Sequence, residues 1–162
     1  MKTREEVSIH PKDAAVFAII DTAEENIPRH VKVLLIQDGD TGPNFWKIPG
    51  GKKKKKELWN ETARRELEEE LGVSLKISSD ELFSTDLVEG PNVHEFVVFA
   101  HSEPSDSDLL KRLRFSPGIT GVHNAAIFNE RQLVGLLNSG LVLEKHERAL
   151  QKYLVEHGIL LR

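Results

Sequence analysis

The chain contains no cysteine among its 162 residues. This absence excludes disulfide bonds, thiolate zinc sites and cysteine nucleophiles, and it is typical of proteins that work in a reducing compartment. The sequence also lacks the run of about 18 apolar residues that a membrane-spanning helix needs, and its charged N-terminus has no apolar segment of the signal-peptide kind. We therefore expect a cytoplasmic protein with no membrane partner.

The chain also has fewer basic than acidic residues. Lysine and arginine contribute 22 side chains against 26 from aspartate and glutamate, which gives a formal net charge of -4. A general nucleic-acid-binding protein is normally basic, so nucleic acid is expected only as a capped-RNA substrate. The content of 39% hydrophobic and 30% charged residues is typical of a globular chain. At this length it predicts a single domain over residues 1–162.

Two common catalytic patterns are missing. No G-x-x-x-x-G-K-[ST] sequence occurs, which excludes a P-loop, and the seven histidines form no H-E-x-x-H pair. His94, His101 and His123 lie in or beside expected strands, where structural or surface roles are the first interpretation. His123 is also a candidate for a substrate or proton role, because it lies near the site that the sequence predicts.

Alternation of β-branched stretches with turn-forming residues predicts an α/β fold with a mixed sheet. Expected strands cover residues 13–20, 31–37, 45–49, 73–77, 81–88, 94–101 and 122–128. Expected helices cover residues 57–71, 129–140 and 142–158. Gly72 is a natural C-cap for the first of these helices. The polar stretch 102–121 predicts a long loop with a turn or two of helix at 108–114, and such loops are often functional.

Three glutamates share one face of the first expected helix. With 3.6 residues per turn, Glu69 lies about 60° to one side of Glu66 and Glu70 about 40° to the other. Like charges at these spacings destabilise a helix by a few tenths of a kcal/mol each, so helix propensity gives no reason for the cluster. A bound cation supplies a reason, because carboxylate oxygens suit Mg²⁺ or Mn²⁺ and leave positions for water and substrate phosphates.

Five consecutive lysines, Lys52–Lys56, precede this helix. One interpretation is a phosphate clamp or leaving-group site, with Lys52 as a substrate-binding candidate, since ammonium groups beside a metal attract a polyphosphate. The other is a solvated loop whose charge offsets the six acids and two arginines of residues 57–70. Charge runs are usually solvated, and the sequence leaves both interpretations open.

The same segment resembles the Nudix box, G-x5-E-x7-R-E-U-x-E-E-x-G-U, where U is an aliphatic residue. Residues 51–73 match every fixed position: Gly51, Glu57, Arg65, Glu66, Leu67, Glu69, Glu70, Gly72 and Val73. Nine residues at fixed spacing make a specific signal, and the preceding F-W-K-I-P-G-G and the late helices extend the resemblance less specifically over most of the chain. The resemblance implies an α/β/α sandwich with a catalytic helix after a Gly-Gly loop.

Nudix proteins hydrolyse nucleoside diphosphates linked to another moiety, and related organic pyrophosphates, with divalent metals. By position, the resemblance implies metal ligation by Glu66, Glu70, Glu69 and the Gly50 carbonyl, with Glu69 as a proton acceptor in the alternative. Glu57 and Arg65 are implied as a pair that holds the loop against the helix. These roles suit the reaction, because metals between carboxylates and phosphates neutralise charge and activate the attacking water.

Two assignments stay open in the sequence. The general base is either a box glutamate or a carboxylate of the long loop, where Glu103, Asp106 and Asp108 are the candidates. Phe45 and Trp46 precede the glycine pair, where an aromatic ring stacks on a nucleobase or packs in the core.

The main prediction is a Mg²⁺-dependent Nudix hydrolase of a small nucleotide-type substrate. The alternative is a Nudix-fold module that binds a nucleotide or RNA for regulation, although the intact box glutamates argue against it. An isopentenyl-diphosphate isomerase is disfavoured, because those relatives use a catalytic thiol. The apolar C-terminal sequence G-I-L-L-R predicts packing against the domain or against a second subunit of a homodimer.

Overall fold

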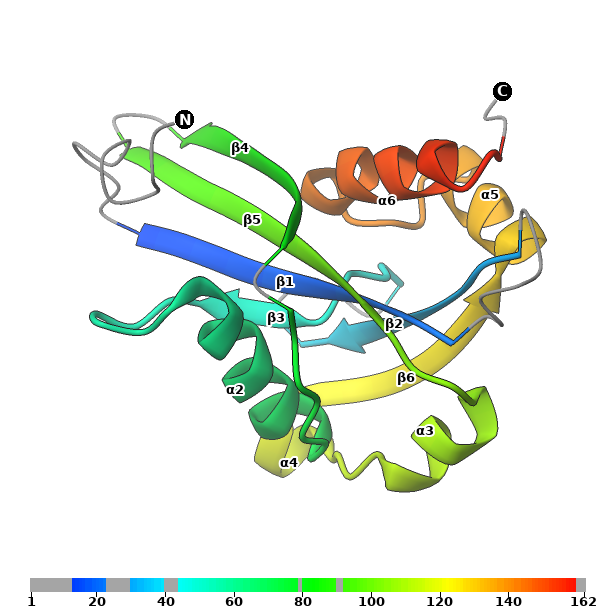
Figure 1. Ribbon diagram of the computed structural model, residues 1–162, viewed down its shortest axis with the longest axis horizontal. Coiled ribbons are helices and arrows are strands. Elements are labelled where there is room, and N and C mark those ends of the chain that lie inside the picture. Colours follow the sequence, from blue (N-terminus) through cyan, green and yellow to red (C-terminus); the bar gives the residue numbers. More distant parts are fainter. Residues whose placement is uncertain (1–12, 23–29, 40–43, 79, 90–91, 160–162) are drawn as a thin grey trace.

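The protein forms a mixed six-stranded sheet with helices on both faces (Figure 1), which confirms the expected α/β/α sandwich. This computed structural model describes residues 13–22, 30–39, 44–78, 80–89 and 92–159. Most of the expected loop between the first two strands, part of the turn after the second, and the last three residues of G-I-L-L-R lie outside these ranges. Among the described helices, none combines the length and apolar character needed to cross a bilayer.

The sheet has the strand order β4-β5-β1-β2-β6, and β3 pairs with β1. The strands are β1 (Asp13–Asp21), β2 (Lys32–Asp38), β3 (Gly50–Lys52), β4 (Glu81–Glu89), β5 (Asn92–Ser102) and β6 (Val122–Asn129). The helices are α2 (Trp59–Leu71), α3 (Asp106–Arg112), α4 (Pro117–Thr120), α5 (Glu130–Asn138) and α6 (Glu144–Glu156). Strands β1 and β5 run parallel, whereas the other paired strands run antiparallel.

Strand β1 lies between two hydrophobic cores. Val16 and Ala18 belong to the core that packs on α2, while Phe17 and Ile19 belong to the core beneath α5 and α6. Figure 1 shows α2 on one face of the sheet and α5 and α6 on the other. Since both faces are covered, β1 reads as a nearly continuous apolar run. Each large side chain buried in this way contributes roughly 1.5–3 kcal/mol of transfer free energy.

Strands β1 and β2 separate like a fork, and the segment after β2 lies between them. The two strands pair at Asp21 and Val33, whereas the other end of β1 pairs with β3. Lys47, in the segment that enters the space between the two strands, forms an isolated bridge to Ile36 of β2. The strand expected at residues 45–49 is therefore wrong: Lys47 and Trp46 make only isolated bridges, to Ile36 of β2 and to Val142, and regular pairing starts with β3.

Two other expectations differ from the structure. Residues 73–77 form no strand, although Val73, Leu75 and Ile77 are buried in the alternating pattern of one. Alternation reports a single buried face, which an extended segment packed on the α2 core also has without ladder partners. The expected long loop, 102–121, contains both α3 and α4.

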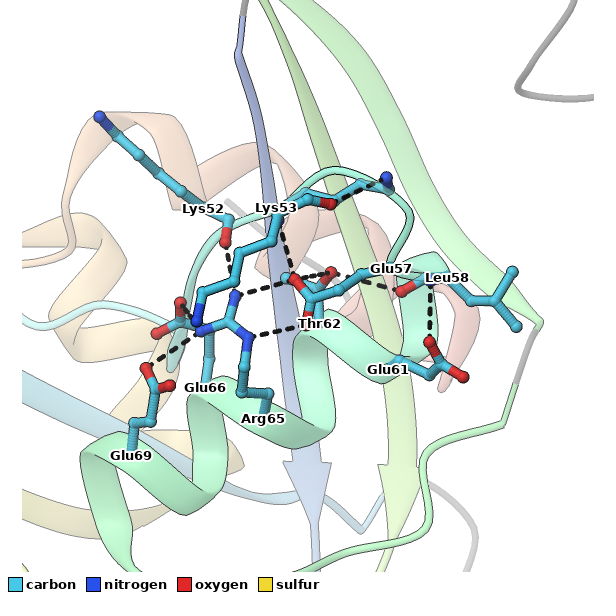
Figure 2. Close-up of polar contacts among 10 residues, drawn as sticks. Lys52, Lys53, Glu57, Leu58, Glu61, Thr62, Arg65, Glu66 and Glu69 are labelled. Carbon is cyan, nitrogen blue, oxygen red and sulfur yellow. Dashed lines mark hydrogen bonds and ion pairs between the residues drawn. The ribbon is translucent and has the colours of Figure 1, made fainter.

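Helix α2 begins at Trp59, two residues after the expected start at Glu57. The Glu57 carboxylate instead accepts hydrogen bonds from Lys54 N–H at 2.8 Å and from Arg65 Nε at 2.7 Å. Arg65 Nη2 also donates to the Lys52 carbonyl at 2.8 Å (Figure 2). A single guanidinium thus ties both ends of the lysine loop to the helix.

Lys56, in this loop, has a left-handed backbone conformation, with φ of 68°. A residue with a side chain loses about 1–2 kcal/mol of stability when its backbone is left-handed. Glycine avoids this strain, and the gain exceeds the stability that glycine loses through its greater freedom in the unfolded chain. We predict that Lys56→Gly raises the free energy of unfolding by roughly 0.5–1 kcal/mol in urea titration. Lys55→Gly is the matched control, and it is expected to lower stability. Equal effects of the two substitutions would contradict the prediction.

Glu57 gives a pH-dependent contribution to stability. The Arg65 guanidinium lowers the pKa of Glu57 from 4.5 to about 2. Since the folded pKa is the lower one, the contribution is complete above pH 4.5 and is lost as pH falls through 2. We predict that Glu57→Gln costs about 1.5–3 kcal/mol at neutral pH, the range for hydrogen bonds to charged groups.

The measurement is urea unfolding of Glu57→Gln and wild-type protein between neutral pH and pH 3. The difference between them should shrink as the pH is lowered below about 4.5, where Glu57 of the unfolded chain takes up its proton. Glu68→Gln, at an exposed position on the same helix, is the control and should change stability by less than about 0.5 kcal/mol. A pH-independent difference would count against the pairing.

Candidate active site

A cavity of about 1060 Å³ lies where α2, β1, β3 and the segment around α4 meet. Its charged wall consists of Asp38, Lys47, Lys52, Glu66, Glu69, Glu70 and Lys145. The three glutamates come from one face of α2, as the helical wheel predicts, while the other residues come from separate parts of the chain. His123 of β6 also lines this cavity.

Two glycines let the loop approach the carboxylates of α2. Gly50 donates its N–H to Glu70 Oε1 at 2.8 Å. A Cβ on Gly50 would lie 2.2 Å from the Val16 carbonyl oxygen, and one on Gly51 would lie 2.5 Å from the carboxyl carbon of Glu66. A larger residue would collide with β1 at position 50 and with the Glu66 carboxylate at position 51, so the two glycines let the loop lie between the strand and the helix.

Glu66 and Glu70 are the more buried carboxylates of the cluster. Burial raises the pKa of both groups, to about 8 for Glu70, even though Arg65 opposes the shift at Glu66 and Lys47 opposes it at Glu70. Nearby cations therefore compensate these acids only in part. The set of hard oxygen donors with a deficit of positive charge fits a divalent cation such as Mg²⁺ or Mn²⁺.

Glu69 is more exposed than Glu66 and Glu70, with 54% of its side chain accessible to solvent. Arg65 Nη1 donates to Glu69 Oε2 at 3.0 Å and to Glu66 Oε1 at 2.9 Å (Figure 2). Within the described ranges, no three acidic or imidazole side chains form a group that could hold a metal ion. Arg65 draws two of the carboxylates to itself while Glu70 bonds to Gly50, so metal ligation by these residues stays a prediction.

Sequence reasoning missed three charged residues of the cavity. Asp38 and Lys47 form an ion pair of 2.8 Å with only 10% and 12% of their side chains exposed. Lys145 comes from the first turn of α6. None of the three belongs to a motif, because Asp38 reads as a turn residue and Lys47 as part of a strand. Asp38 and Lys47 come together because β1 and β2 diverge, and Lys145 joins them because α6 packs on the sheet.

The loop carboxylates proposed as general bases lie elsewhere. Glu103, Asp106 and Asp108 do not line the cavity. Glu103 bonds to Arg112 Nη1 at 3.3 Å, and its N–H donates to the carbonyl of Asp21. Asp21 ends β1 four residues beyond Phe17 of the cavity wall, a separation of about 13 Å along a strand. The acids that do line the cavity are Glu66, Glu69 and Glu70 of the box together with Asp38.

Of the substrate-binding candidates, Lys52 lines the cavity and the two aromatic residues do not. Trp46 packs edge to face on Phe128, with ring centroids 4.7 Å apart, on the side of the sheet covered by α5 and α6. Phe45 is 40% exposed. Lys53 extends over the Trp59 ring at 5.4 Å, so neighbouring lysines of the run have different surroundings.

Comparisons with known proteins identify the fold, which three of the matching solved structures illustrate. The MutT NUDIX hydrolase from Burkholderia pseudomallei has a TM-score of 0.59 and 20% identity, covering 86% of this chain and 96% of its own. An Ap4A hydrolase from C. elegans has a TM-score of 0.61 and 16% identity, covering 90% and 98%. The NUDIX domain of Shewanella oneidensis NrtR, solved with ADP ribose, has a TM-score of 0.60 and 19% identity, covering 98% and 97%.

These identities show the fold alone, and no curated protein matches the sequence. The family itself is shown by the sequence profile of the NUDIX domain, which matches residues 10–133 and therefore most of the chain. Members of this family are generally pyrophosphohydrolases that use divalent metals. With the complete box folded as a loop and helix beside a charged cavity, this chain belongs to the Nudix family.

Proposed function

We propose that this protein is a Mg²⁺-dependent hydrolase, with Mn²⁺ as a substitute, that cleaves a phosphoanhydride bond. Its substrate is a nucleoside diphosphate derivative or a related organic pyrophosphate. The observation that carries the proposal is the pair of partly buried carboxylates with raised pKa values, Glu66 and Glu70, in the wall of a large cavity. Buried acids with raised pKa values cluster at sites where a ligand completes the charge balance.

Glu66, Glu70, Glu69 and the Gly50 carbonyl are the groups proposed to hold the metal. When bound, a divalent ion neutralises phosphate oxygens and lowers the pKa of the attacking water. The residues of the chain position these groups. The Gly50 N–H orients Glu70, while Arg65 orients Glu66 and, from its opposite edge, bonds Glu57.

Glu69 is proposed as an additional metal ligand or, in the alternative, as the proton acceptor. Its exposed carboxylate can reach water in the cavity, whereas Glu66 and Glu70 are more enclosed. Lys52 is proposed to bind substrate phosphate, because it lines the cavity near the box glutamates. An ammonium group there attracts a diphosphate and leaves the metal ligands untouched.

The proposal covers a single domain that acts on a small molecule in the cytoplasm. Ile159, the described part of the apolar C-terminal sequence, is 4% exposed and packs into the core beneath α5 and α6. This supports packing of Ile159 on its own domain over its use as a dimer contact.

The first test is Glu70→Gln. The amide keeps an acceptor for Gly50 N–H but removes a ligand charge, so we predict a loss of at least about 100-fold in metal-dependent kcat. Turnover is measured on a nucleotide panel with Mg²⁺ and Mn²⁺, and both products are identified to show which phosphorus is attacked. Glu68→Gln, an exposed neighbour, should retain wild-type turnover.

Wild-type kcat in Glu70→Gln would refute the role of Glu70. A wild-type protein that hydrolyses nothing in the panel, but binds one of its members, would instead favour the regulatory binding module. The same panel thus separates an enzyme from a sensor.

The second test separates the two interpretations of the lysine run. We predict that Lys52→Gln raises KM by roughly 10- to 100-fold, the effect of losing one hydrogen bond between charged groups. Lys55→Gln is the control, because Lys55 is exposed and lines neither this cavity nor the smaller one beside it. An unaltered KM in Lys52→Gln would support the solvated-loop interpretation.

A further inference from the structure

Strand β6 has one residue more than its partner β2 at the end that reaches the cavity. Asn124 of β6 pairs with Gln37 of β2, and Val122 pairs with Asp38. His123 lies between these two pairs with no residue opposite it, so the strand has a β-bulge at this point. A bulge turns the side chain of its extra residue in a new direction, and bulges are frequent beside active sites. The bulge is the local reason why His123 lines the cavity.

His123 lies beside the charges that surround Glu70. Asp38, which pairs with the residue before His123, forms the buried ion pair with Lys47. Burial raises the pKa of Glu70, Lys47 opposes this rise, and Asp38 adds to it. A Cβ at position 39 would lie 3.3 Å from His123 Nε2, so Gly39 leaves space beside the ring. The imidazole therefore reaches the cavity from the adjoining ends of β2 and β6, whereas the glutamates reach it from α2.

The ring of His123 is exposed, and it makes no hydrogen bond or ion pair with another described residue. The acids that line the same cavity each have a bonded donor, and they are Asp38, Glu66, Glu69 and Glu70. The lysines of the cavity are ammonium groups, which donate hydrogen bonds and accept none. Within the described part of the cavity wall, His123 is therefore the proton-accepting side chain to which no residue donates.

Hydrolysis of a phosphoanhydride needs a group that takes a proton from the attacking water. Glu69 accepts a hydrogen bond from Arg65 at 3.0 Å. A neighbouring guanidinium stabilises the charged form of a carboxylate and makes it a weaker proton acceptor. Imidazole exchanges protons near neutral pH without any perturbation, and one of its nitrogens is an acceptor when the ring is neutral. Because His123 is exposed, it can also pass a proton to solvent after each turnover.

We propose that His123 is the proton acceptor of the hydrolysis. Its ring nitrogen takes one proton from the attacking water as the water oxygen bonds to phosphorus, and the bond from phosphorus to the bridging oxygen breaks. The departing phosphate keeps the electron pair of that bond, and the imidazolium returns its proton to solvent. This inference rests on the proposed function, and it leaves Glu69 with the role of an additional metal ligand.

The first test is turnover of His123→Gln with the substrate found in the nucleotide panel, at saturating Mg²⁺. Glutamine keeps a hydrogen-bond donor and acceptor at this position but cannot hold the transferred proton. Since general base catalysis typically contributes 10²–10⁴-fold, kcat should fall by about 100-fold or more, with little change in KM. Asn124→Ala is the control on the same strand, because Asn124 is exposed and does not line the cavity. Wild-type kcat in His123→Gln would overturn the proposal.

The variant His123→Ala separates proton transfer from a structural role. Removal of the ring leaves room for imidazole added to the buffer, which should restore part of the lost kcat. Across substituted imidazoles of similar size, the restored rate should rise with their basicity, as Brønsted behaviour requires of proton transfer. Glu70→Gln lacks a ligand charge and keeps His123, so added imidazole should leave its kcat unchanged. Rescue that is absent, or that is independent of basicity, would overturn the proposal.

The wild-type protein separates a failure of this inference from a failure of the proposed function. Hydrolysis of a panel member at equal kcat by wild type and His123→Gln rejects the role of His123 and leaves the metal-dependent hydrolase intact. Absence of hydrolysis by wild type with both Mg²⁺ and Mn²⁺ rejects the proposed function and, with it, the step assigned to His123.

Discussion

The contact between the glycine loop and α2 is the constraint on which the site depends. Gly50 lies against β1 and donates its N–H to Glu70, and Gly51 lies against the Glu66 carboxylate, at positions where a Cβ would collide with Val16 and Glu66 respectively. The same loop pairs with β1 as strand β3, so the helix carboxylates are fixed relative to the central sheet. Arg65 completes the arrangement by bonding the Lys52 carbonyl on the other side of the loop. Helix, loop and sheet are therefore positioned by one short stretch of chain.

That arrangement also concentrates negative charge in a partly buried place. Burial disfavours the ionised forms of Glu66 and Glu70, and this effect outweighs the nearby cations at both groups. A helix selected for stability alone would separate such acids, since like charges three and four residues apart repel. The cluster is retained beside a cavity where a cation and a charged substrate can offset it. The cost in stability and the capacity to bind thus have the same origin.

Sequence reasoning succeeds here where structure is local. The spacing from Gly51 to Val73 encodes a loop, a helix and its cap, so the placement of Glu66 and Glu70 on one face of α2 follows from periodicity. It fails where tertiary contacts decide. Residues 73–77 have a strand pattern but no strand partner, and Lys47 acquires its position only because β1 and β2 diverge. No local signal carries that information.

Helix α6 shows how a distant element adds to a local motif. Its packing through Leu150 and Tyr153 fixes its N-terminal turn against Phe17 in the middle of β1, which lines the larger cavity. Lys145 and His146 are consecutive, and side chains one residue apart on a helix diverge by about 100°. Lys145 thereby reaches the larger cavity while His146 contacts Phe17 and Phe96. A substitution of Lys145 changes the charge of this cavity without touching the box, because core residues hold α6 in place.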